Sequence, residues 1–133
     1  MRLTCNVFML AVLAGSPGLA ADKPDRQGLD FFESKIRPVL VRHCYQCHSA
    51  KAVAAKTLKG GLQLDTRDGA RKGGESGPAV VPGKPGQSLL ISALKHETVK
   101  MPPKAKLPDA IIADFVKWIS IGAPDPREGK SVT

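Results

Sequence analysis

The sequence Cys44-Tyr45-Gln46-Cys47-His48 restricts the fold and the chemistry of this chain more than any other part of it. Two thiols separated by two residues lie on successive parts of one helical turn, and the histidine directly after them can reach the same ligand. This is the attachment pattern of a c-type haem, in which both thiols bond the vinyl groups along one haem edge. The motif therefore predicts one covalent haem c, bound through Cys44 and Cys47, with His48 as an axial ligand of the iron.

Three other interpretations of the cysteine pair remain. A zinc site would need a second pair of Cys or His residues at finger-like spacing, and the sequence has none. A thioredoxin-like redox pair requires a βαβ context, which the helical patterns and the Gly-rich region do not offer. A structural disulfide between Cys44 and Cys47 would leave His48 unexplained.

The length and composition of the chain describe one small domain. It has 133 residues, of which 42% are hydrophobic, and its mean hydropathy is -0.12. These values are typical of a soluble globular protein and exclude a multidomain enzyme. Aromatic residues make up only 5% of the chain. A bound porphyrin would supply the large flat apolar surface that so few aromatic side chains cannot provide.

Residues 1–20 have the features of a secretory signal peptide. Arg2 is the only charged residue, Val7–Ala14 is apolar, and small residues lead to an expected cleavage site after Ala20. The apolar stretch is too short to span a membrane, so the mature chain is expected to have no stable membrane span. A retained N-terminal anchor is the alternative. Export predicts a periplasmic or otherwise oxidising location.

Amphipathic patterns predict an all-α fold of about three to four helices. Apolar residues recur at helical spacing over residues 29–41, where Pro38 is expected to introduce a kink. A second helix is expected over residues 88–97, with Ser88 as its N-cap. A third is expected over residues 109–122, ending at a glycine that two prolines follow.

The region between the first two helices is expected to be irregular. Residues 50–59 are rich in Ala and Lys and fit a short exposed helix or a loop. Residues 60–86 contain eight glycines and three prolines, which predicts a long loop made mostly of turns. Its apolar residues are expected to anchor it to the core; they are Leu62, Leu64, Val80 and Val81.

An electron-carrying haem iron needs a second axial ligand, and Met101 is the only methionine left after signal cleavage. It stands in a polar Lys-Pro loop where a methionine that only fills the core has little purpose. A thioether opposite a histidine is the pairing that raises the reduction potential of cytochromes c. His96 is the reserve ligand. His43 is less suitable, because its position beside Cys44 ties it to the wrong side of the ring.

Seven sequence motifs together resemble the planctomycete-type cytochrome c domain. The similarity runs from about Leu29 to Pro126. The motifs are Phe31–Leu40, Cys44–His48, Lys59–Asp65, Gly74–Pro78, Val81–Gly83, Ser88–Leu90 and Met101–Lys104. The resemblance implies a small class I cytochrome c fold around the haem, in which the N- and C-terminal helices cross. Phe32 and Ile36 would then pack against Phe115, Trp118 and Ile119.

The expected domain organisation follows from these boundaries. Residues 29–126 form the cytochrome c domain, 21–28 a mobile lead and 127–133 a flexible tail.

The chain is basic, with 20 Lys and Arg against 12 Asp and Glu and a formal charge of +8. One explanation is a solubilising surface. The other is a positive ring about the haem edge that steers a redox partner with an acidic docking surface. Arg67 is a candidate to pair with a haem propionate. Nucleic-acid binding is disfavoured by the expected export and by the lack of interleaved aromatic residues.

These observations predict a monohaem, His/Met-ligated c-type cytochrome that carries electrons in the periplasm. It is expected to be a carrier and not an enzyme, because an iron with both axial positions filled has no open site for a substrate. The alternative is a haem- or metal-binding module without catalytic activity that docks onto a larger partner protein.

Overall fold

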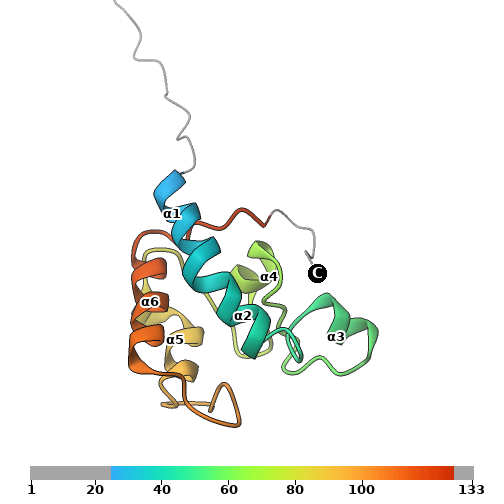
Figure 1. The fold of residues 1–133 in the computed structure, drawn as a ribbon. Helices are drawn as coiled ribbons and strands as arrows, with labels where there is room; N and C mark the ends of the chain where they lie inside the picture. Colours follow the sequence, from blue (N-terminus) through green and yellow to red (C-terminus); the bar gives the residue numbers. More distant parts are fainter. Residues whose placement is uncertain (1–24, 128–133) are drawn as a thin grey trace, which may run out of the picture.

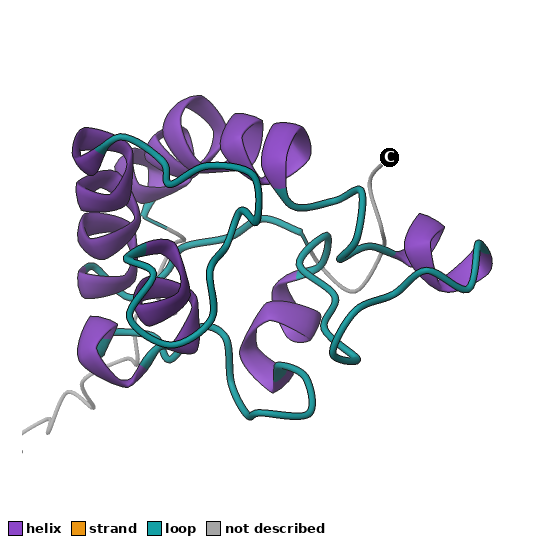
Figure 2. Ribbon diagram, turned by 90° about the horizontal axis from the view of Figure 1, so that it is seen from below, coloured by secondary structure: helices purple, strands orange, loops and turns teal. Residues whose placement is uncertain are grey.

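The computed structural model describes residues 25–127, and within this range the protein is helical without a β-strand (Figures 1 and 2). The only β pairing in this part of the chain is an isolated bridge between Gly74 and Gly77. The all-α prediction is therefore confirmed. The expected signal peptide, the first part of the lead (21–24) and residues 128–133 lie outside the described residues.

The N-terminal helix consists of three consecutive segments: α1 (Arg26–Phe31), the π-helical η1 (Phe32–Ile36) and α2 (Arg37–His43). It begins three residues before the expected start at Leu29. The reason is Asp25, whose carboxylate accepts a hydrogen bond from the Gln27 N–H at 3.1 Å and so caps the helix. Residues 26–28 of the expected mobile lead are therefore helical.

The π-helical segment ends at Ile36, two residues before Pro38. The Arg37 N–H donates to the Phe32 carbonyl, five residues earlier, where an α-helix would use the residue four earlier. Pro38 has no N–H to donate and its ring crowds the preceding turn of an α-helix. The wider turn ends where α2 begins, so the helical chain continues through the proline.

The N-terminal helix packs against the C-terminal helix α6 (Asp109–Ser120), beside which it runs in Figure 1. The Phe32 and Trp118 rings have their centroids 5.5 Å apart, and Phe115 meets Trp118 edge-on at 6.2 Å. Ile36 and Ile119 are fully buried in the same cluster. The packing that the family resemblance implied for these five residues is present.

Two short helices lie between the N-terminal helix and residue 85. α3 (Ala50–Ala54) is the short helix that was one of two expectations for residues 50–59, and it projects from the body of the molecule in Figure 1. α4 (Arg67–Lys72) lies in the region expected to be mostly turns. Thr66 explains it, because its hydroxyl accepts a hydrogen bond from the Gly69 N–H at 3.0 Å and caps the helix.

A 3-10 turn, η2 (Pro85–Gln87), leads into α5 (Leu89–Leu94). Ser88 stands at the N-cap position as expected, but its side chain does not cap the helix. Its hydroxyl instead accepts from the Val81 N–H at 2.9 Å and donates to the Lys84 carbonyl at 3.0 Å. The helix also ends before the expected Glu97, because His96 adopts a left-handed backbone with φ of 61°.

The C-terminal segment folds back over the two crossing helices. The Trp118 indole N–H donates to the Pro124 carbonyl at 2.8 Å. The Pro124 ring also packs closely against Gly28, because a Cβ added to Gly28 would lie only 2.5 Å from the ring. Arg127 is only 2% exposed. Arg127, the first residue of the segment expected to be a flexible tail, is thus part of the packed structure.

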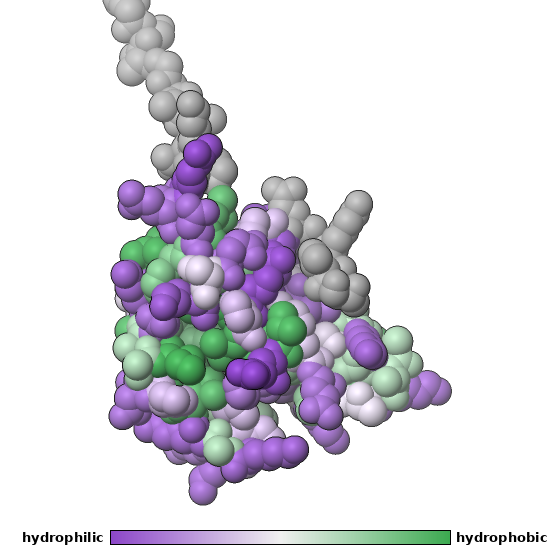
Figure 3. Space-filling view, viewed as in Figure 1, coloured by the Kyte–Doolittle hydropathy of each residue, from purple (hydrophilic) through white to green (hydrophobic). Residues whose placement is uncertain are grey.

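Hydrophilic side chains cover most of the face in Figure 3, and apolar groups show between them over the helices. Val41, on α2, is 54% exposed. No helix within residues 25–127 is long and apolar enough to cross a membrane.

Candidate functional site

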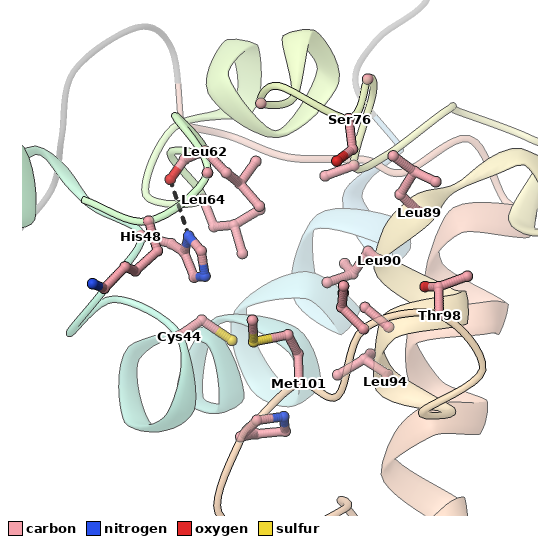
Figure 4. A pocket seen from close by; sticks show the side chains of 18 of the residues that line it. Cys44, His48, Leu62, Leu64, Ser76, Leu89, Leu90, Leu94, Thr98 and Met101 are labelled. Atoms are coloured by element: carbon pink, nitrogen blue, oxygen red, sulfur yellow. Dashed lines mark hydrogen bonds between the residues drawn. The ribbon is translucent and has the colours of Figure 1, made fainter.

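A cavity of about 440 Å³ opens beside the Cys44–His48 motif (Figure 4). Its walls come from five parts of the chain: residues 43–48, residues 59–64, residues 74–79, α5 and the loop 98–102. Cavities of roughly 300–1,000 Å³ hold most small-molecule ligands and cofactors. The size therefore fits a large prosthetic group.

The walls of this cavity are mostly apolar. Five leucines line the cavity, together with Ala79, Ala93 and Val99. The leucines are Leu62, Leu64, Leu89, Leu90 and Leu94. Apart from His48, the basic side chains on the wall are Lys59 and His43, both exposed, and the described lining contains no carboxylate. The cavity thus suits a large apolar ring that carries negative charge at its edge.

The cysteine motif forms a tight turn at the end of α2. The N–H groups of Cys47 and His48 both donate to the Cys44 carbonyl, at 3.2 and 3.0 Å. Cys44 lines the cavity, whereas Cys47 is partly buried and is not part of the wall. Burial raises the pKa of the Cys44 thiol to about 12, so the unmodified thiol is protonated at neutral pH. Both cysteines are free thiols in the structure.

His48 is held in one orientation by the segment opposite it. Its Nδ1 lies 3.2 Å from the Leu62 carbonyl oxygen. Because a carbonyl only accepts hydrogen bonds, this contact assigns the ring proton to Nδ1 and leaves the Nε2 lone pair free. The Leu64 N–H in turn donates to the His48 carbonyl at 2.9 Å. The imidazole points into the cavity in Figure 4, in the form that a metal ligand requires.

Met101 reaches the same cavity from a distant part of the chain. Its backbone N–H donates to the Ala93 carbonyl at 3.2 Å, which ties the loop to the end of α5. Its thioether points into the cavity, on the side where Cys44 lies (Figure 4). The fold therefore brings together Cys44, His48 and Met101, three of the residues that the sequence singled out.

The fold does not bring the other candidates to the cavity wall. Arg67 lies with its Nε 3.7 Å from the Asp68 carboxylate and is not among the lining residues. His96 is also absent from the wall, and its Nε2 is buried without a hydrogen-bond partner in the described structure. Lys59, which the sequence analysis did not propose as a site residue, does lie on the wall. The available signal was its place in the Lys59–Asp65 motif.

The zinc alternative lacks a ligand set in the part of the chain that the structure describes. Over residues 25–127, no three side chains among His, Cys, Asp and Glu lie close enough together to hold a metal ion. Cys44 and His48 instead border one large apolar space. This donor set, with one thiol, one imidazole and one thioether around an apolar cavity, fits an attached haem.

An all-α domain whose Cys-x-x-Cys-His turn opens onto an apolar cavity has the features of a c-type cytochrome. Residues 44–105 match the family model described as Planctomycete cytochrome C, which supports the resemblance of this part of the chain to the planctomycete-type cytochrome c domain. The matched range begins at Cys44 and includes both His48 and Met101. Covalently bound haem c is the cofactor that this family implies. No match was found among the curated proteins or the solved structures.

Proposed function

We propose that this protein is a monohaem electron carrier of the periplasm, in which His48 and Met101 are the two axial ligands of the iron. The observation that carries this proposal is the convergence of the two side chains on one apolar cavity that Cys44 also borders. Bound haem supplies a one-electron Fe(III)/Fe(II) couple, and with both axial positions filled the electron exchange is outer-sphere. The protein is thus a carrier and not an enzyme.

The residues around the cavity have distinct tasks in this proposal. The Leu62 carbonyl keeps the His48 ring in place and makes it a stronger electron donor, because it accepts a hydrogen bond from the Nδ1–H. The Met101 thioether favours the reduced iron and raises the potential. The leucine walls exclude water and so lower the local dielectric. Little then has to move when the charge of the centre changes.

The first experiment uses protein produced with a cytochrome c maturation system. The expected product has one haem per chain, retains it after denaturation, and shows the absorption spectrum of low-spin His/Met ligation. Its mass also reports the N-terminus, where loss of residues 1–20 is expected. Haem that dissociates on denaturation would overturn the covalent assignment.

The ligand assignment is tested by Met101→Ala. Loss of the thioether is expected to abolish the His/Met signature and to let external ligands such as imidazole bind the iron. His96→Ala is the matched control, since His96 lies off the cavity wall, and its spectrum is expected to be that of the wild type. An unchanged spectrum in Met101→Ala together with a changed one in His96→Ala would transfer the ligand role to His96.

The partner of this carrier is proposed to present an acidic docking surface. Lys59 lines the cavity and is exposed, and the cavity also reaches the surface at Leu89 and Val99, which are 37% and 57% exposed. Lys100 and Lys104 flank the Met101 loop and are exposed. An apolar opening bordered by lysines favours docking of a negatively charged protein near the haem edge.

A further inference from the structure

Arg127 carries a buried charge that the electron-transfer proposal does not use. Its side chain is 1% exposed and pairs with Asp125, to which Nε donates at 2.8 Å and Nη2 at 2.5 Å. The guanidinium lies over the Phe32 ring, 4.8 Å from its centroid. Burial of an ion pair is costly unless further hydrogen bonds satisfy its remaining donors and acceptors.

The remaining donor, Nη1, makes two hydrogen bonds to residues far away in the sequence. It donates to the Tyr45 hydroxyl at 2.7 Å and to the Leu64 carbonyl at 2.5 Å. Tyr45 lies between the two cysteines of the haem motif, and Leu64 lies on the cavity wall. Arg127 therefore contacts both segments that meet at His48.

The segment of residues 62–64 is held from two sides. On one side, the His48 carbonyl accepts a hydrogen bond from the Leu64 N–H, and the His48 Nδ1–H donates one to the Leu62 carbonyl. On the other side, Arg127 binds the Leu64 carbonyl. Residues 60–65 lie outside the helices, and within this stretch the Leu62 N–H donates to the Lys59 carbonyl at 3.2 Å. The contacts with His48 and Arg127 add to this turn and help to fix the Leu62 carbonyl.

We propose that Arg127 is a positioning residue of the haem centre, which holds the Leu64 carbonyl and the Tyr45 hydroxyl and thereby fixes the Leu62 carbonyl that orients His48. This inference rests on the proposed role of His48 as an axial ligand. A firmly placed acceptor at Nδ1 strengthens the imidazole as a donor, and a stronger donor favours Fe(III). Loss of the Arg127 contacts should therefore raise the reduction potential.

The test uses the haem-loaded full chain and the double variant Arg127→Leu with Asp125→Asn. Both charges of the pair are removed together, so the net charge beside the haem is unchanged and a shift in potential reports geometry. Two quantities are measured: the reduction potential, and the exchange rate of the His48 Nδ1 proton by NMR of the reduced protein. The expected result is a higher potential and a several-fold faster exchange.

Ile112→Ala is the control for general destabilisation, because Ile112 is buried in α6 and is not part of the cavity wall. It is expected to lower the melting temperature while leaving the potential and the proton exchange unchanged. The same shifts in Ile112→Ala, or wild-type values in the double variant, would overturn the proposal. The proposed function is tested separately by the absorption spectrum of the wild-type holoprotein. A spectrum without His48 ligation would refute that function, and no variant is needed to observe it.

Tyr45→Phe keeps the test decisive if the double variant does not fold. It removes only the hydroxyl that Arg127 holds and leaves the Leu64 contact in place. A smaller shift of the potential in the same direction is expected. A potential equal to that of the wild type would count against the positioning role.

Discussion

Tyr45 lies inside the haem motif but contacts the protein interior. Its hydroxyl accepts a hydrogen bond from Arg127, and burial raises its pKa above the ordinary value of 10.0, while the nearby guanidinium partly opposes this. The two residues between the cysteines of such a motif do not bind the haem or its iron. Here one of them joins the motif to the C-terminal segment.

The raised pKa of Tyr45 predicts a loss of stability at alkaline pH. The phenol binds its proton more tightly in the folded state than in the unfolded state, so its contribution is fully present below pH 10. It is lost as the pH rises through the folded-state pKa. Unfolding free energies of the holoprotein, measured between neutral and strongly alkaline pH, should therefore fall more steeply for the wild type than for Tyr45→Phe. Parallel curves would contradict the prediction.

At the scale of single elements, the glycine-rich turn of residues 73–78 shapes one wall of the cavity. Gly74 and Gly77 form the isolated bridge that closes the turn, and both line the cavity. Gly73 precedes them with φ of 76°, and a Cβ at this position would overlap the Gly77 carbonyl. The turn thus requires glycine at position 73 for both its backbone angle and its close approach.

Gly73→Ala and Gly83→Ala separate these two requirements. Gly83 has nearly the same φ of 77°, but a Cβ there would meet no atom within 4 Å. Gly83→Ala should lower the free energy of unfolding by about 1 kcal/mol through backbone strain alone. Gly73→Ala should lose about 1–3 kcal/mol more, because the carbonyl has to move. Chemical denaturation of both holoproteins measures the difference, and equal losses would show that the turn tolerates a side chain.

The charge of the whole molecule governs how it meets a partner. The chain has a formal charge of +8, and the cavity opens where Lys59 is exposed. Long-range attraction of an anion to such a surface raises the association rate and is screened by salt. The electron-exchange rate with anionic reagents should therefore fall as ionic strength rises.

Small redox reagents of opposite charge make this measurement specific. The rate with hexacyanoferrate is expected to decrease with salt, and the rate with hexaammineruthenium to increase. Lys59→Glu should weaken the salt dependence more than Lys117→Glu, which makes the same charge change on α6, away from the cavity. Identical responses of the two variants would mean that net charge alone acts and that no positive ring surrounds the haem edge.

The sequence by itself determined the local features of this protein. The spacing of Cys44, Cys47 and His48 indicated haem attachment, and apolar periodicity located the N- and C-terminal helices and α5. These signals lie within windows of a few turns, which a sequence shows directly. Boundaries were less accurate where a side chain decided them, as with Asp25 at α1 and Thr66 at α4.

Only the tertiary structure decided which residues reach the cavity and what holds them there. It placed Lys59 and not Arg67 on the wall, and it joined His48 to the Leu62 carbonyl. It also showed Arg127 to be buried, with partners 82 and 63 residues away in the sequence. Backbone carbonyls are the same in every residue, and contacts over such separations depend on the packing of the whole chain. No local pattern in the sequence encodes them.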